Sequence, residues 1–203
     1  MSRPADIQAA RQAEVSRKTR ETDIQVELRL DGSGMAEVET GVPFFDHLLD
    51  AFTRHGFFDL RVKAQGDLEV DQHHTIEDIG ITLGQAVRKA CGDGSGLTRF
   101  GSSRIPMADV LMEVDLDLSN RPYMVYNVAL QRDWVGRFDA ALVEDFLYAF
   151  CSNAGADLHV NLRYGHNVHH TVEAVFKGLG RALDQATRID PRIEGPLSTK
   201  GSL

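Results

Sequence analysis

The sequence predicts an α+β fold made from one half-domain that is duplicated within the chain, with sheets packed against helices. The first observation is a repeat: the pair His73-His74 and its surroundings recur at His169-His170, 96 residues later. The second is that segments alternating between polar and apolar residues are followed by longer segments with the apolar spacing of helices. Paired strands followed by paired helices are typical of α+β layers rather than of a doubly wound parallel sheet.

Both copies of the repeat contain the same parts in the same order. A segment with helical spacing is followed by a strand, then by a His-His pair with a trailing Glu, and then by a long amphipathic segment. In the first copy these parts are residues 46–52, 57–64, 71–78 and 79–90, and in the second they are residues 144–150, 157–162, 167–174 and 175–186. Self-similarity of this kind indicates duplication of one unit, and the period is too long for a solenoid.

Local residue types predict the remaining elements of the first half. Residues 23–30 alternate between polar and apolar, Asp31-Gly32-Ser33-Gly34 predicts a hairpin turn, and residues 35–40 form the returning strand. Pro43 suits the first turn of a helix that Gly56 can end.

In the second half, residues 110–118 alternate, residues 119–122 mark a turn, and residues 123–130 return as a strand. No linker or low-complexity segment separates the halves, so we expect them to share one core. The expected organisation is an N-terminal extension (1–17), a first half-domain (18–96), a second half-domain (97–190) and a C-terminal tail (191–203).

Composition excludes several classes of function. A net charge of −8 over 203 residues argues against nucleic acid as a partner, because phosphate backbones require a basic surface. No apolar run approaches the roughly 20 residues that span a bilayer, and the N-terminus lacks the apolar stretch of a signal peptide. The two cysteines, Cys91 and Cys151, are too few for a disulfide framework, and they lack the spacing of a zinc motif. We therefore expect a cytoplasmic protein.

The repeated histidines indicate metal binding. Imidazole together with carboxylate suits divalent cations such as Mn, Fe, Co or Zn. Positions i and i+4 share a helix face, so His73 would lie beside Glu77, and His169 beside Glu173, if these segments are helical. Adjacent helical residues point about 100° apart, so the two members of a His-His pair can serve two metals. An isolated pair is typical of an exposed helix start, but two copies with the same trailing Glu favour a metal site.

Several long segments resemble those of the imidazoleglycerol-phosphate dehydratase family of histidine-biosynthesis enzymes. They are GVPFFDHLLDAFTRHGFFDL, DQHHTIEDIG, RFGSSRIPM, DLSNRPY, NVHHTVEAVFKGLGRAL and STKGSL, within residues 17–203. The resemblance implies a duplicated half-domain similar to the second domain of ribosomal protein S5. It also implies a hollow homo-oligomeric shell of 24 subunits, with two Mn²⁺ ions per active site between subunits.

Carried over by position, the resemblance implies two sets of metal ligands. The first comprises His47, His74, His169 and Glu173, and the second comprises His73, Glu77, His170 and Asp145. Many family members have His where this chain has Asp145. A carboxylate is a competent ligand for Mn, so we expect function to survive with altered affinity or metal preference. The neighbouring Glu144 is an alternative ligand.

The resemblance also assigns residues to the substrate. The residues implied to bind the phosphorylated substrate are Glu21, Arg99, Arg121, Lys177, Ser198, Thr199 and Lys200. Glu21 is the candidate general acid/base, and direct proton transfer is the weaker expectation for the metal ligands Glu77 and Glu173. Residues 198–201 are expected to be a flexible segment that closes over the ligand.

The implied reaction is dehydration of imidazole glycerol phosphate to imidazole acetol phosphate. The carbon that loses the proton has no neighbouring carbonyl, so simple abstraction by a base would be slow. We therefore expect the metals to hold the ring as an imidazolate whose electrons expel the hydroxyl. Two alternatives remain at this point. A di-metal phosphate hydrolase would use similar ligands, and in a non-enzymatic assembly protein the metals would only join subunits. Other divalent metals than Mn also remain open.

Overall fold

The computed structural model describes residues 11–201 and contains two similar half-domains in one chain. The first comprises β1 (Gln12–Lys18), β2 (Thr22–Arg29), β3 (Met35–Glu39), α1 (Pro43–Gly56), β4 (Asp59–Gly66) and α2 (His73–Cys91). The second comprises β5 (Phe100–Met107), β6 (Val110–Asp117), β7 (Tyr123–Asn127), β8 (Trp134–Val135), β9 (Phe138–Asp139), α3 (Leu142–Ala154), β10 (Asp157–Tyr164) and α4 (Val168–Thr187). The order of elements is the same in both, except that the short β8–β9 pair is inserted in the second.

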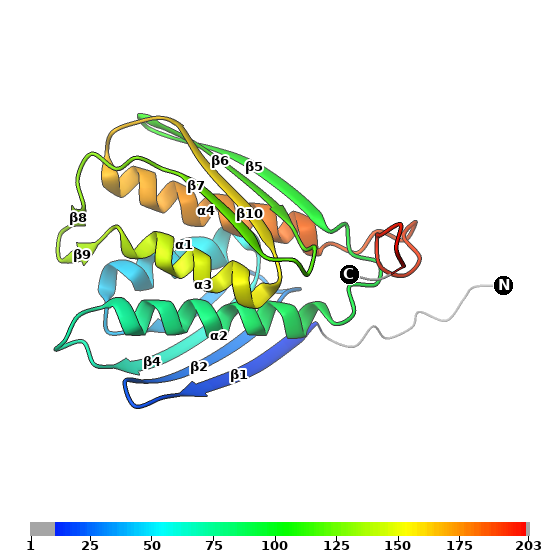
Figure 1. Ribbon diagram of the computed structural model, residues 1–203, viewed down its shortest axis with the longest axis horizontal. Coiled ribbons are helices and arrows are strands. Elements are labelled where there is room, and N and C mark those ends of the chain that lie inside the picture. The colour runs from blue at the N-terminus through cyan, green and yellow to red at the C-terminus, as the bar shows by residue number, and fades with distance from the viewer. Residues whose placement is uncertain (1–10, 202–203) are drawn as a thin grey trace.

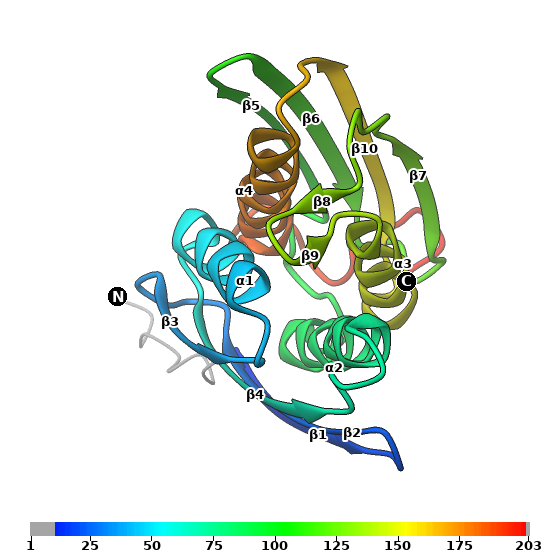
Figure 2. The same ribbon diagram turned by 90° about the vertical axis from the view of Figure 1, so that its left-hand side faces the viewer.

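The two four-stranded sheets are the outer layers, and the four helices lie between them (Figure 1). Helix α2 packs against α3, and α1 against α4, so each pair combines one helix from each half (Figure 2). Phe45 of α1 lies 5.3 Å from Phe146 of α3 and 5.9 Å from Phe176 of α4, measured between ring centroids. One buried apolar cluster runs through both halves. The predicted α+β class and shared core are confirmed.

Two glycines at equivalent positions of the repeat allow the helix pairs to approach closely. A Cβ atom on Gly84 of α2 would lie 2.4 Å from the carbonyl oxygen of Phe150, and one on Gly180 of α4 would lie 2.3 Å from that of Phe52. The same backbone contact therefore occurs in both helix pairs. The duplication extends from the sequence to the packing of the helices.

The predicted hairpin at residues 31–34 is wrong. Strand β3 does not return along β2 but pairs in parallel with β4, with α1 as the crossover between them. The turn residues are held by Asp59 instead, whose carboxylate accepts hydrogen bonds from the backbone N–H groups of Ser33 (2.7 Å) and Met35 (3.3 Å). This contact fastens the turn to the start of β4 and sends the chain to the far edge of the sheet.

The predicted return of the chain along the preceding strand is also wrong in the second half. Residues 123–130 were expected to return after the turn at 119–122, but β7 ends at Asn127 and pairs in parallel with β10, not with β6. In both halves the order of strands is therefore set by a helical crossover, which a parallel pair requires.

Strand β1 overlaps the predicted N-terminal extension (1–17) and ends at Lys18. Residues 12–18 pair antiparallel with β2 along their whole length, so the first sheet begins before residue 18. Along β1 only Ala13 is buried, and a strand this polar gives a weak periodic signal. Residues 1–10 of the predicted extension lie outside the described residues.

Within residues 11–201, no helix combines the length and the apolar character needed to cross a membrane.

Candidate metal centre

The first turns of α2 and α4, which carry the His-His pairs, lie at the same end of the molecule, on the left in Figure 1. Helix α3 also begins at this end. The fold therefore gathers the repeated histidines from both halves, although they are far apart in the sequence.

Three predicted ligands converge in the first cluster, which we define as His47, His169 and Glu173. The Nε2 atoms of His47 and His169 both lie 3.1 Å from Oε2 of Glu173. One ligand atom from each residue lies within 4.8 Å of the other two, which is the spacing of a site that could hold a metal ion. The aromatic ring of Phe44 lies against both imidazoles, at centroid distances of 6.0 and 5.0 Å.

Glu173 of this cluster is held as a carboxylate. Burial raises the pKa of Glu173, but hydrogen bonds from Lys177 and His47 outweigh it, and the pKa falls to about 2. Lys177 lies one helical turn later, with its Nζ 2.6 Å from Oε1 of Glu173. Lys177, predicted to bind substrate, is thus the charge partner of a predicted metal ligand.

The second cluster comprises His73, Glu77 and Asp145. His73 Nδ1 lies 3.4 Å from Oδ2 of Asp145, and His73 Nε2 lies 3.8 Å from Oε2 of Glu77. Opposite ring nitrogens face the two carboxylates, so the ligand atoms do not converge as they do in the first cluster. Both carboxylate side chains are more than 40% exposed and have room to turn. Asp145 faces the histidine, and no hydrogen bond or ion pair joins Glu144 to it within residues 11–201.

The two clusters are related by the internal repeat. Asp145 on α3 stands where His47 stands on α1, and each contacts a residue on the first turns of the helix that pairs with its own: His47 contacts Glu173, and Asp145 contacts His73. The donor chemistry suits a divalent cation in both cases, because imidazole and carboxylate oxygen are the ligands that Mn, Fe, Co and Zn accept.

The structure does not bring His74 and His170 into the clusters of their own chain. The Nδ1–H of His74 donates to Asp67 at 3.0 Å, and that of His170 donates to Asp109 at 2.8 Å. The rings of adjacent histidines are steeply inclined, at 74° for the first pair and 84° for the second, so neighbours do point to different places. A carboxylate on Nδ1 fixes the tautomer that leaves Nε2 available to a metal.

These two hydrogen bonds also shift pKa values of the groups that they join. The bond to Asp67 raises the pKa of His74 above its ordinary value, and the bond from His170 holds the pKa of Asp109 well below its usual range. Neither aspartate is among the site residues predicted from the sequence. Neither belongs to a periodic pattern, and each is recognisable only as a carboxylate in a turn that the fold brings beside a histidine.

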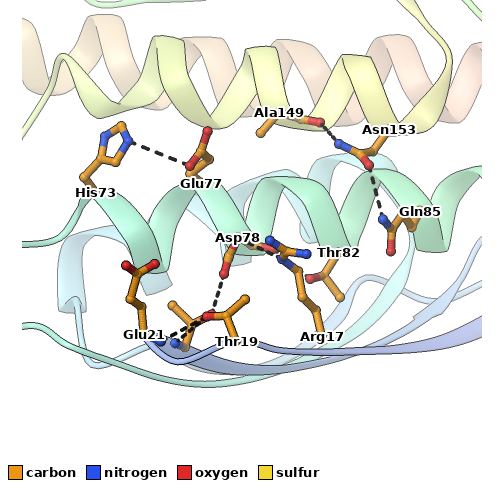
Figure 3. Close-up of polar contacts among 11 residues, drawn as sticks. Arg17, Thr19, Glu21, His73, Glu77, Asp78, Thr82, Gln85, Ala149 and Asn153 are labelled. Carbon is orange, nitrogen blue, oxygen red and sulfur yellow. Dashed lines mark hydrogen bonds and ion pairs between the residues drawn. The ribbon is translucent and has the colours of Figure 1, made fainter.

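Glu21 lies in the turn between β1 and β2, near the start of α2 (Figure 3). Its backbone N–H donates to Thr19 Oγ1 at 3.1 Å. The turn is fastened to α2 by buried Asp78, whose carboxylate accepts hydrogen bonds from Arg17 Nε (2.8 Å) and Thr22 Oγ1. Figure 3 shows His73 and Glu77 on the opposite side of this helix. No hydrogen bond or ion pair of the Glu21 carboxylate occurs within residues 11–201.

The predicted phosphate ligands lie at the other end of the molecule. Arg99, Arg121 and the tail residues Ser198, Thr199 and Lys200 line a cavity of about 740 Å³. Arg99 is paired with Asp117 through Nε (2.6 Å) and donates from Nη1 to the carbonyl of Leu197 at 2.8 Å. Its backbone N–H donates to the carbonyl of Ala186, 17 residues after His169, which is about 25 Å along α4 at the helical rise.

Within one chain, therefore, the predicted site residues form two separate groups. Lys177 belongs to the group at the metal end, and the two arginines with the tail belong to the group at the far end. A small phosphorylated molecule cannot reach across this distance, so a site that uses both groups needs a second copy of the chain.

Comparisons with known proteins agree with this architecture. The sequence model of the imidazoleglycerol-phosphate dehydratase family matches residues 40–183. The chain is 56% identical to imidazoleglycerol-phosphate dehydratase of Trichlorobacter lovleyi over 193 residues, which covers 95% of this chain and 99% of that protein. It is 55% identical to the enzyme of the same name from Acetivibrio thermocellus, over 95% of this chain and 99% of that protein.

Solved structures are similar as well. The crystal structure of imidazoleglycerol-phosphate dehydratase from Staphylococcus aureus matches with a TM-score of 0.78 and 36% identity, over 88% of this chain and all of that one. The enzyme from Pyrococcus furiosus, solved in complex with (S)-C348, matches with a TM-score of 0.80 and 40% identity, over 93% and 99% of the two chains.

Proposed function

The chain belongs to the imidazoleglycerol-phosphate dehydratase family, a family of hydro-lyases, and from this we propose that it dehydrates imidazole glycerol phosphate with two divalent metal ions. The product is imidazole acetol phosphate, and the step belongs to histidine biosynthesis, in the cytoplasm. The observation that carries the metal proposal is the convergence of His47 and His169 on one carboxylate oxygen of Glu173. Mn²⁺ is the expected metal.

Each cluster supplies three protein ligands and gains a fourth from another copy of the chain. His47, His169 and Glu173 would be completed by His74 of a second copy, and His73, Glu77 and Asp145 by His170 of a second copy. The support is that both histidines keep Nδ1 on an aspartate and are about one-third exposed. Bound metal would supply Lewis acidity that favours the deprotonated imidazole ring and the departure of the hydroxyl group. A closed homo-oligomer follows, and the 24-subunit shell is the expected form.

Glu21 is the proposed general acid/base. It lies near His74, close enough that its charge contributes to raising the pKa of that imidazole. Glu173 is unsuited to carrying a proton, because its pKa of about 2 keeps it ionised at neutral pH. Glu77 is committed to the second cluster through His73.

The phosphate would be held by the group at the far end of a neighbouring chain. Arg99 is fixed by Asp117 and by the carbonyl of Leu197, so it orients the tail as well as contributing charge. Arg121 and the tail residues Ser198, Thr199 and Lys200 complete the cavity. Arginine suits this task because its planar fork matches phosphate oxygens.

The decisive experiment is turnover of imidazole glycerol phosphate by chelator-stripped protein, with and without added Mn²⁺. We expect a phosphorylated ketone as product, restored by Mn²⁺, with no inorganic phosphate released. Release of phosphate would indicate a di-metal hydrolase instead. Metal-dependent assembly with no turnover and no binding of the substrate would indicate a purely structural role.

A further inference from the structure

We infer that the two metal sites of this chain differ in metal preference, and that Asp145 determines the difference. Both clusters accept Mn²⁺, but the first cluster has the higher relative affinity for nitrogen-seeking cations such as Zn²⁺, and the second cluster favours hard cations such as Mn²⁺ more strongly. The inference rests on the proposed metal sites, but it concerns a property that is measured without catalysis.

The two clusters differ in their metal-binding side chains. The first cluster offers two imidazoles and one carboxylate, whereas the second offers one imidazole and two carboxylates. One further imidazole from another copy would leave the first site with three nitrogen donors and the second with two. Imidazole favours Zn and other later transition metals, whereas carboxylate favours Mn, Mg and Ca.

The two clusters also differ in the charged groups around their carboxylates. In the first cluster, the carboxylate of Glu173 is neutralised by Lys177 at 2.6 Å. The repeat places Ile81 on α2 where α4 has Lys177, and no lysine or arginine forms an ion pair with Glu77 or Asp145 within residues 11–201. The first cluster therefore pairs its one carboxylate with a lysine, whereas the second has two carboxylates and no lysine or arginine partner among the described residues.

The ligand atoms of the first cluster are closer to a metal-binding arrangement than those of the second. Glu173 is buried and receives both imidazoles on one oxygen, so its ligand atoms already surround a small space. In the second cluster the exposed carboxylates lie on opposite sides of the His73 ring and can bind through one oxygen or two. A compact set suits the tetrahedral preference of Zn²⁺, whereas adaptable oxygen ligands suit hard cations with more coordination positions.

The test uses full-length assembled protein, stripped with a chelator and reloaded with excess Mn²⁺ plus one equivalent of Zn²⁺ per chain. Anomalous diffraction at the zinc and manganese edges then locates each metal. We expect zinc in the first cluster and manganese in the second. Equal zinc signals at both clusters, or zinc mainly in the second, would overturn the inference.

Asp145→His is the decisive variant, because it gives the second cluster the donor set of the first. We expect zinc to divide between the two clusters in this variant. Glu144→Gln is the matched control, since it removes the adjacent carboxylate that does not face His73, and its metal distribution should equal that of the unaltered protein. An unchanged zinc distribution in Asp145→His contradicts the inference.

The metal measurement and the turnover assay separate the two proposals. Protein that distributes the metals as described but does not dehydrate the substrate would support the inference and refute the proposed activity. Protein that dehydrates the substrate while holding the same metal at both sites would support the proposed activity and refute the inference. Failure to retain either metal would overturn both the inference and the metal dependence.

Discussion

Glu21 differs from its counterpart in the second half-domain in one respect that matters for its role. It directly precedes β2, as Asp109 directly precedes β6. Asp109 is occupied by the imidazole of His170, but in the first half Asp67 has that task for His74. The carboxylate of Glu21 is consequently available for proton transfer.

Replacing Glu21 by Gln is expected to lower kcat by about 10²–10⁴-fold, the contribution of a positioned general acid/base. The amide keeps the size of the side chain but cannot carry the proton. Metal content, measured by elemental analysis, should be unchanged, because Glu21 is not among the clustered ligands. Turnover at the normal rate would remove Glu21 from the mechanism.

Asp109→Asn tests the carboxylate behind His170. The change removes the ionised acceptor that holds the Nδ1–H, and loss of such a partner weakens metal binding by about 10–100-fold. Competition with a fluorescent chelator measures the affinity. Asp115→Asn, on the exposed face of β6, is the control and should bind metal normally. Equal affinities for the two variants would show that His170 needs no carboxylate.

At the scale of elements, the helix pairs are held at a distance that only glycine permits. Gly84→Ala would place a methyl group against the carbonyl of Phe150. Alanine is favoured over glycine in a helix by about 1 kcal/mol, but overpacking of this kind costs about 1–3 kcal/mol. Because the contact is with rigid backbone, we expect the clash to exceed the gain.

Calorimetry at fixed protein concentration should therefore show a lower Tm for Gly84→Ala, and also for Gly180→Ala, whose contact with Phe52 is equivalent. Arg88→Ala, on the exposed face of α2, is the control and should leave the Tm nearly unchanged. A Tm that stays the same or rises in both glycine variants would mean that the helices separate without cost.

At the scale of the whole molecule, the end that carries the two histidine clusters lies far from the end that carries Arg121 and the tail. This separation predicts that two inactive variants, one altered at each end, restore activity in a mixed assembly. Glu21→Gln impairs only the metal end of a chain, and Arg121→Ala impairs only the end that holds the cavity. In mixed assemblies, some sites combine an intact metal end from one chain with an intact phosphate end from another.

Assemblies made by co-expressing these two variants should consequently regain activity that neither variant has alone. Each variant dissociated and reassembled by itself is the control and should stay inactive. If mixed assemblies, verified by mass spectrometry, remain as inactive as the parents, each active site is built from one chain.

Much of the fold could be predicted from the sequence because its signals are local. The α+β class, the duplication and the positions of α1, α2 and α4 follow from hydrophobic periodicity and from residues repeated in order. The pairing of His73 with Glu77, and of His169 with Glu173, follows from helical spacing alone.

The partners of these elements were decided only by tertiary structure. The strand order differs from the predicted hairpin because Asp59 binds the turn at 31–34 and a helix intervenes before the next strand. His47 reaches Glu173 across 126 residues because α1 packs on α4. Such contacts depend on which faces bury each other, and no local pattern encodes that choice. The sequence by itself determined the residue types of the candidate ligands and the helices that carry them, whereas packing of the two halves determined which of these residues share a cluster and which stay outside it.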